Sequence, residues 1–300
     1  MQKLLDKFLD YMSAFTSDSI HTQDAYRRDV NRFIEYLESI GLTLREVDIH
    51  VASQYIMLLK EGKFGAKKLA NSSIVRNLSS LRTFYYYLIE FYQYQLNPFT
   101  LIKSQSQTRN LPDFLTYDEM IRLLNSIDYN SDIGLRNKCM LELMYACGLR
   151  VSELVSLKVE DINIEERFIR VIGKGDKERI VPFYPLVAKM LSKYLIEVRN
   201  NWQNNNMELF IKANGKPLTT RYVQMYVRDL ALKANIAFNV HPHMFRHSFA
   251  THLLDNGADL RVVQELLGHE YLSTTQIYTH LSVDSLKKTY LATHPSAKAK

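Results

Sequence analysis

The sequence predicts a mainly α-helical protein of two domains, with one small β-hairpin in the second domain. Five apolar residues between Ile74 and Leu88 recur at alternating spacings of four and three, the period of an amphipathic helix. A polar segment without apolar periodicity, residues 103–110, separates the two halves. Alternating β-branched residues flank a Gly-Lys-Gly-Asp turn at residues 173–176, which is typical of a hairpin.

Composition and charge restrict the class of protein. The chain has 300 residues, of which 46% are hydrophobic and 23% charged, so each half is long enough to bury a core. No apolar run reaches the roughly 18 residues of a membrane-spanning helix, and no membrane partner is expected. Lys and Arg outnumber Asp and Glu by 38 to 32, which permits nucleic-acid binding without establishing it. The two cysteines, Cys139 and Cys147, are too few for a disulfide framework, which favours the reducing cytoplasm.

The first domain, residues 1–102, is predicted to be a helical bundle. Its first stretch, MQKLLDKFLDYMSAF, carries Asp6 and Asp10 within an apolar pattern and is an amphipathic helix rather than a signal peptide. Three more helices are expected. The first is capped by Thr22 and ends at Gly41, and the second covers about residues 51–60. The third starts at Ser72 or Ser73. The basic run EGKFGAKKLA, with its two glycines, is expected to be a loop.

Residues 103–112 are predicted to form a linker, and residues 113–300 the second domain. Thr116 followed by Glu119 is a capping-box pattern that starts the first helix of this domain. A helix ending at Cys147 should stop at Gly148. After the hairpin the chain returns to helices, over residues 186–199, 220–235 and several short segments between 241 and 278.

Six side chains of the second domain could converge on one anion: Arg150, Lys174, His243, Arg246, His269 and Tyr278. Each has an ordinary explanation by itself, such as an Arg150–Glu153 ion pair or a solvated turn lysine. Together they suit phosphoryl transfer, because guanidinium groups match phosphate oxygens and a tyrosine hydroxyl can attack phosphorus. The sequence has neither a carboxylate cluster for Mg²⁺ nor a glycine-rich nucleotide loop, so no metal or cofactor is expected.

Four segments resemble the sequence boxes of the tyrosine recombinase (lambda-integrase-like) family, and most closely its bacterial Xer-type branch. GLRVSEL resembles the first arginine box, GKGDKERIVPF the lysine hairpin, HPHMFRHSFATHLL the His-x-x-Arg box, and LLGHEYLSTTQIYTH the final histidine and tyrosine segment. The boxes stand in the family order, and the likeness covers the whole chain. The resemblance implies an N-terminal SAM-like core-binding domain and a C-terminal catalytic domain with the DNA breaking-rejoining enzyme fold.

The resemblance implies a role for each reacting residue. Tyr278 would attack the scissile phosphate and leave a 3′-phosphotyrosyl link with a free 5′-hydroxyl. Arg150 and Arg246 would hold the non-bridging oxygens, and Lys174 would protonate the 5′-oxygen. Because the phosphotyrosine stores the bond energy, strand exchange would need neither ATP nor metal.

Supporting roles fall to other residues. His243 and His269 would assist proton transfer, and Glu153 would orient the site from behind the groups that touch phosphate. A further set of basic residues either contacts DNA phosphates or is merely solvated: Lys63, Lys67, Lys68, Arg76, Arg221 and Arg228.

The implied partner is a double-stranded DNA recombination site, bound by a tetramer of this chain alone or with a like recombinase. Exchange through a Holliday junction would resolve chromosome or plasmid multimers, with a septal DNA translocase as a further candidate partner. Two alternatives stay open: a mobile-element integrase or excisionase, and a DNA-binding module without catalysis. A C-terminal apolar stripe of Leu286, Tyr290 and Leu291 would pack on a neighbouring protomer or on its own domain.

Overall fold

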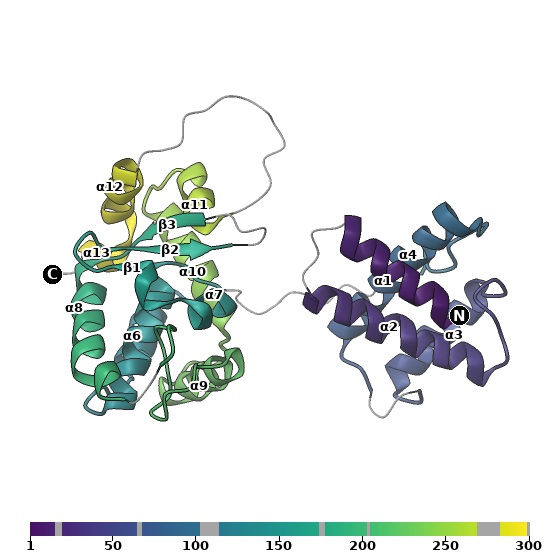
Figure 1. Ribbon diagram of the computed structural model, residues 1–300, viewed down its shortest axis with the longest axis horizontal. Coiled ribbons are helices and arrows are strands. Elements are labelled where there is room, and N and C mark those ends of the chain that lie inside the picture. The colour runs from purple at the N-terminus through teal and green to yellow at the C-terminus, as the bar shows by residue number, and fades with distance from the viewer. Residues whose placement is uncertain are drawn as a thin grey trace. The chain divides into compact units, whose positions relative to one another are not determined.

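The structure, a computed structural model, describes residues 1–15, 20–64, 68–102, 114–173, 178–202, 205–268 and 283–298 (Figure 1). The chain divides into two compact units, Met1–Asn110 and Leu111–Lys300, and each has its own hydrophobic core. The predicted linker, residues 103–112, lies outside the described residues. Helices dominate both units, which confirms the mainly helical class. Within the described ranges, no helix is long and apolar enough to cross a membrane.

The first unit is a bundle of helices α1 (Gln2–Phe15), α2 (Ile20–Ser39), α3 (Ile49–Glu61) and α4 (Asn71–Tyr92). Helix α2 packs against both α1 and α4, and α3 packs against α4. Aromatic rings fill the space between them, and the rings of Phe8, Phe33 and Phe84 are fully buried. Their edge-to-face contacts, such as Phe8 to Phe84 at 5.2 Å between ring centroids, add to the energy of burial.

Two of the predicted helix starts are wrong, by one to three residues. Helix α2 already begins at Ile20, so Thr22 lies inside its first turn. Helix α4 begins at Asn71 instead of Ser72 or Ser73, and the residue before it, Ala70, offers no capping side chain. The buried apolar stripe fixes where these helices run, and it tolerates an uncapped end.

A buried carboxylate joins two helices of this bundle. Asp29 of α2 is fully buried and accepts hydrogen bonds from Arg76 and from the Ser80 hydroxyl, the latter at 2.9 Å, both on α4. Arg76 is one of the candidates for a phosphate contact, and 44% of its side chain is exposed. Its nearest partner in the structure is therefore Asp29, which needs the arginine because a buried unpaired carboxylate is costly.

The second unit contains the remaining α-helices. They are α5 (Tyr117–Asn125), α6 (Asp132–Ala146), α7 (Val151–Ser156), α8 (Pro185–Lys193), α9 (Thr220–Lys233), α10 (Pro242–Asp255), α11 (Leu260–Leu267), α12 (Val283–Thr293) and α13 (Pro295–Lys298). Helix α6 is central, since it is buried from Gly134 to Ala146 and contacts α5, α7, α8 and α10. The predicted capping box of Thr116 and Glu119 at the start of α5 is confirmed.

The predicted hairpin is present and belongs to a slightly larger sheet. Its antiparallel strands are β1 (Ile162–Asn163), β2 (Phe168–Ile172) and β3 (Glu178–Pro182), in the order β1-β2-β3. Ile169 lies opposite Val181, and Val171 lies opposite Arg179. The hairpin tip at 174–177, including Lys174, lies outside the described residues. The two-residue strand β1 is too short to produce a sequence pattern, and it forms by pairing with β2.

The predicted helix over residues 186–199 is shorter than expected. Helix α8 ends at Lys193. The chain then forms a π-helical turn, Tyr194–Val198, and a 3₁₀ turn, Arg199–Asn201. The Arg199 guanidinium, in the last of these turns, donates to backbone carbonyls of residues 206–209. Turning the chain here buries that arginine with its acceptors, a tertiary contact that local periodicity does not reveal.

The C-terminal stripe packs on its own unit. Helix α12 lies beside β3 (Figure 1) and also contacts α10 and α11. Its Leu286 and Tyr290 belong to the core of the second unit. Beyond it, His294 is fully buried among aromatic rings, with centroids 4.9 Å from Tyr145 and 5.0 Å from Tyr290. Burial, and then the neighbouring His252, lower the pKa of His294 to about 3.

Acid should destabilise the second unit through His294. Its folded-state pKa lies below its unfolded value of about 6.5, so the unfolded chain binds an extra proton below that pH and stability falls. Between pH 7 and pH 5 the loss is about 2 kcal/mol. Urea titrations followed by the fluorescence of Trp202, the single tryptophan, report this unit.

His294→Phe should remove most of that loss, whereas His241→Gln, a change at an exposed histidine, should keep it. If His294→Phe and the wild type lose the same stability between the two pH values, the assignment to His294 is wrong.

Candidate active site

Arg150 is placed by a tight turn between two helices. Helix α6 ends at Ala146, and Gly148 follows with a left-handed φ of +57°, which confirms the predicted stop. A Cβ on Gly148 would lie 2.5 Å from Cδ1 of Phe249, so only glycine fits this approach. Arg150 then stands at the N-cap of α7, with 44% of its side chain exposed.

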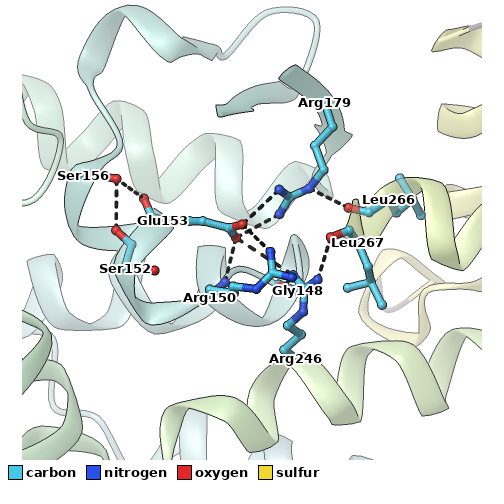
Figure 2. Close-up of polar contacts among 9 residues, drawn as sticks. All are labelled: Gly148, Arg150, Ser152, Glu153, Ser156, Arg179, Arg246, Leu266 and Leu267. Atoms are coloured by element: carbon cyan, nitrogen blue, oxygen red, sulfur yellow. Dashed lines mark hydrogen bonds and ion pairs between the residues drawn. The ribbon is translucent and has the colours of Figure 1, made fainter. Parts of the chain in front are cut away.

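The carboxylate of Glu153 is the centre of the site (Figure 2). Only 7% of the side chain is exposed. It accepts from the Arg150 backbone N–H at 2.8 Å and from Arg150 Nη1 at 2.9 Å. The predicted Arg150–Glu153 pair is therefore present, but it is part of a larger cluster and does not explain Arg150 by itself.

Arg179 of β3 is the second guanidinium on this carboxylate. Its Nη1 and Nη2 donate to the two oxygens of Glu153 at 3.0 and 2.9 Å, a bidentate geometry. Its Nε donates to the backbone carbonyl of Leu266 at 3.0 Å, in the last turn of α11. With 9% of its side chain exposed, Arg179 links three elements inside the unit.

Arg246 of α10 is the third guanidinium, and it is also buried. Its Nη1 donates to the carbonyl of Gly148 at 2.8 Å and lies 3.9 Å from Oε2 of Glu153, while Nη2 donates to Leu267 at 2.5 Å. The two carbonyl bonds occupy two of the five N–H groups of a guanidinium. His243 lies three residues earlier on the same helix, and its side chain is exposed.

The charges of the cluster shift the pKa values of its members. Burial by itself raises the pKa of Glu153, but hydrogen bonds and charge from Arg179 and Arg150 outweigh it, and the net pKa is lowered. Burial and then Arg150 lower the pKa of Arg246 to about 10, so Arg246 stays protonated at neutral pH. Partial burial, and then the charge of Arg246, lower the pKa of His243, which favours its neutral form.

Three guanidinium groups around one carboxylate leave an excess of positive charge. Arg150 is exposed, and Arg246 and His243 stand beside it on α10. Such a group attracts and holds an oxyanion, since the arginines are oriented in advance by contacts with the protein. Lys174, His269 and Tyr278 lie outside the described residues. Helix α11 ends at Leu267, and Gly268 follows as its left-handed C-cap.

The candidate phosphate contacts are spread over both units. Arg221 and Arg228 are exposed on α9, which packs against α7 and α10, the helices of Arg150 and Arg246. In the first unit, Lys63 pairs with Glu61 at 2.8 Å, and Lys68 is exposed. Lys67 lies outside the described residues.

Arg179 belongs to the cluster but was not predicted from the sequence as a site residue. A signal for it exists in strand β3. Arg179 and Val181 point to the same face of the strand, opposite Val171 and Ile169 of β2, and these three apolar residues are buried. An arginine on the apolar face of a strand must have a partner, because a buried cation without one is strongly disfavoured.

Glu153→Gln should change the acid stability of the second unit. The lowered pKa means that the stabilisation from the carboxylate is complete above about pH 5 and is lost as pH falls through the folded-state value. Between pH 5 and pH 3 the wild type should therefore lose more stability than the variant, by up to about 1.4 kcal/mol per pH unit. Trp202 fluorescence in urea titrations measures both. Parallel pH curves for the two proteins would contradict this.

Two family models match this chain, one in each of its two units. Residues 113–284 match the family described as "Phage integrase family", and residues 5–90 match "Phage integrase, N-terminal SAM-like domain". The chain is 38% identical over 300 residues to the tyrosine recombinase XerD of Staphylococcus epidermidis, covering 99% of this chain and 100% of the relative. It is 39% identical over 304 residues to XerD of Listeria innocua, with the same coverage.

Solved structures share the fold. The site-specific recombinase XerH, bound to its difH substrate in a pre-cleavage complex, matches with a TM-score of 0.67 and 27% identity, over 89% of this chain and 78% of that one. The integrase of transposon Tn1549, in complex with circular intermediate DNA, matches with a TM-score of 0.69 and 22% identity, over 95% and 98%. The chain therefore belongs to the phage integrase family and is a tyrosine site-specific recombinase.

Proposed function

We propose that Arg150 and Arg246 clamp the non-bridging oxygens of one scissile DNA phosphate. The observation that carries this proposal is the convergence of both guanidinium groups on Glu153, with Arg150 still exposed. Glu153 holds one arm of the clamp and lies beside the other, and so orients the pair. His243, neutral and exposed next to Arg246, assists proton transfer.

Tyr278 supplies the nucleophile in this proposal. Its hydroxyl oxygen attacks phosphorus while its proton passes to the neutral imidazole of His243, the bond to the 5′-oxygen breaks, and a 3′-phosphotyrosyl link forms. Lys174, which lies between β2 and β3 in the sequence, gives its proton to the departing 5′-oxygen, and His269 stabilises the transition state. The assignment of these three residues rests on the sequence boxes and on the elements that flank them, β3 and the end of α11. No residue in this scheme requires a metal or ATP.

The substrate that we propose is a double-stranded DNA recombination site. XerH and the Tn1549 integrase are both described with DNA, and the excess of positive charge at the Glu153 cluster suits a phosphodiester. In this scheme residues 113–300 form the catalytic domain and residues 1–102 a second DNA-contacting domain, joined by residues 103–112. Four protomers, of this chain alone or with a like recombinase, exchange strands in pairs through a Holliday junction.

The biological role that we propose is resolution of chromosome or plasmid multimers in the cytoplasm. XerD relatives that match over the whole chain support this role over that of a mobile-element integrase. Two free, buried cysteines are compatible with a reducing compartment. A septal DNA translocase remains a candidate activator of the assembled complex.

Wild-type protein should become covalently joined to a nicked suicide substrate, and Tyr278→Phe should not, because phenylalanine has no oxygen to attack phosphorus. Denaturing gel electrophoresis of protein incubated with end-labelled DNA measures the adduct. Tyr290→Phe is a matched control, since it removes the hydroxyl of another tyrosine of the C-terminal segment and should still form the adduct. An adduct with Tyr278→Phe would exclude Tyr278 as the nucleophile.

Neutralising Arg221 or Arg228 should flatten the salt dependence of DNA binding. Each lost phosphate contact reduces the slope of log K against log salt by about 0.9. Binding isotherms at several salt concentrations measure the slope for Arg221→Gln, Arg228→Gln and the control Lys189→Gln. Lys189 is exposed on α8, a helix that is not part of the cluster. Equal slopes for all three variants and the wild type would mean that α9 makes no phosphate contact.

A further inference from the structure

We propose that Arg179 is a positioning residue of the active site, which keeps Glu153 from drawing Arg246 away from the phosphate. The proposal rests on the proposed phosphate clamp and deepens it. Among the described residues, no hydrogen bond joins Arg179 to Arg150 or Arg246, and Arg179 acts through the carboxylate that all three surround (Figure 2).

The hydrogen bonds of Glu153 are fully used. A carboxylate has about four acceptor positions, and Glu153 fills them with two donors from Arg150 and two from Arg179. Arg246 stays 3.9 Å from the nearer carboxylate oxygen, with its own bonds directed to the carbonyls of Gly148 and Leu267. Because Arg179 fills two of the acceptor positions of the carboxylate, the N–H groups of Arg246 make no hydrogen bond to Glu153.

Loss of Arg179 would change this division. Glu153 would keep its burial but lose two of its four donors, and a buried carboxylate recruits a replacement because an unsatisfied charge is costly. Arg150 is already bound to Glu153, and the next guanidinium in reach is that of Arg246, 3.9 Å from the carboxylate. The carboxylate would then draw the clamp inward and away from a bound phosphate.

Arg179 also connects the site to the two segments that flank it. It lies on β3, two residues beyond the hairpin tip at 174–177, and its Nε binds the carbonyl of Leu266. A Cβ added to Gly268 would lie 3.1 Å from Cδ of Arg179, so the arginine stem passes directly beside the end of α11. Residue 269 follows at once. One side chain thus fixes the hairpin, Glu153 and the end of α11 relative to one another.

A double-mutant experiment tests the proposal with the full-length protein and a nicked suicide DNA. Arg179→Met should lower the rate of adduct formation at saturating DNA on the order of 100-fold, with the Kd for DNA changed less than about threefold, because misplaced reacting groups slow the reaction step. Adding Glu153→Gln to Arg179→Met should restore the rate at least about tenfold, since a neutral amide does not attract Arg246 as a carboxylate does.

A purely structural role for Arg179 makes the opposite prediction. The second substitution would then leave the rate unchanged or lower it further, and either result overturns the proposal, as does an Arg179→Met protein with the wild-type rate. Trp202 fluorescence in urea checks folding of each variant. If Arg179→Met does not fold, the charge-retaining Arg179→Lys replaces it, and a wild-type rate for that variant overturns the proposal equally, because lysine cannot make the bidentate contact.

Two controls separate this proposal from the proposed function. Arg170→Met removes a neighbouring strand arginine that pairs with Asp161 at 3.2 Å, away from Glu153, and should keep the wild-type rate. If wild-type protein forms no adduct, or Tyr278→Phe still does, the proposed function fails. If the wild type behaves as proposed and only the rescue is missing, the role of Arg179 alone fails.

Discussion

The buried carboxylate of Glu153 is the interaction on which the site depends. A carboxylate with 7% of its side chain exposed is tolerated only when its oxygens are paired, and here it is paired by Arg150 and Arg179. The hydrogen bonds and charge of these partners outweigh burial, and so the pKa of Glu153 is lowered. Because those two arginines come from α7 and β3, and Arg246 approaches from α10, one anion brings together elements that are far apart in the sequence.

Helix α6 also carries buried charged residues, and each of them is paired with another polar or aromatic group. On α6, Lys138 pairs with Glu142 at 3.0 Å, and the Tyr184 hydroxyl donates to the same carboxylate. Arg136 lies over the rings of Trp202 and Tyr222, at 5.8 and 5.0 Å from their centroids, which links α6 to α9. These satisfied polar contacts specify how the helices pack, whereas apolar burial alone would tolerate several arrangements.

Local sequence signals predicted well wherever the physical cause is local. The capping box of α5 involves residues three apart, and the stop after α6 requires a left-handed glycine at Gly148. Signals failed where a distant contact decides. The π-helical turn after Lys193 leads into Arg199, whose guanidinium binds carbonyls seven to ten residues further along the chain. The short strand β1 is defined by its pairing with β2. Thr22 has the chemistry of a cap, but α2 extends past it.

The sequence by itself determined the family and the helical class, because these follow from residue types at short spacings. Arg150 at the N-cap of α7 is three residues from Glu153, and His243 is three residues from Arg246 on α10, so the proximity within each pair needs no tertiary information. Only the tertiary structure decided that Arg179 shares Glu153, that the C-terminal stripe packs on its own unit, and that His294 is buried. Each depends on which distant surface a side chain meets, and periodicity gives the buried face of an element but not its neighbour.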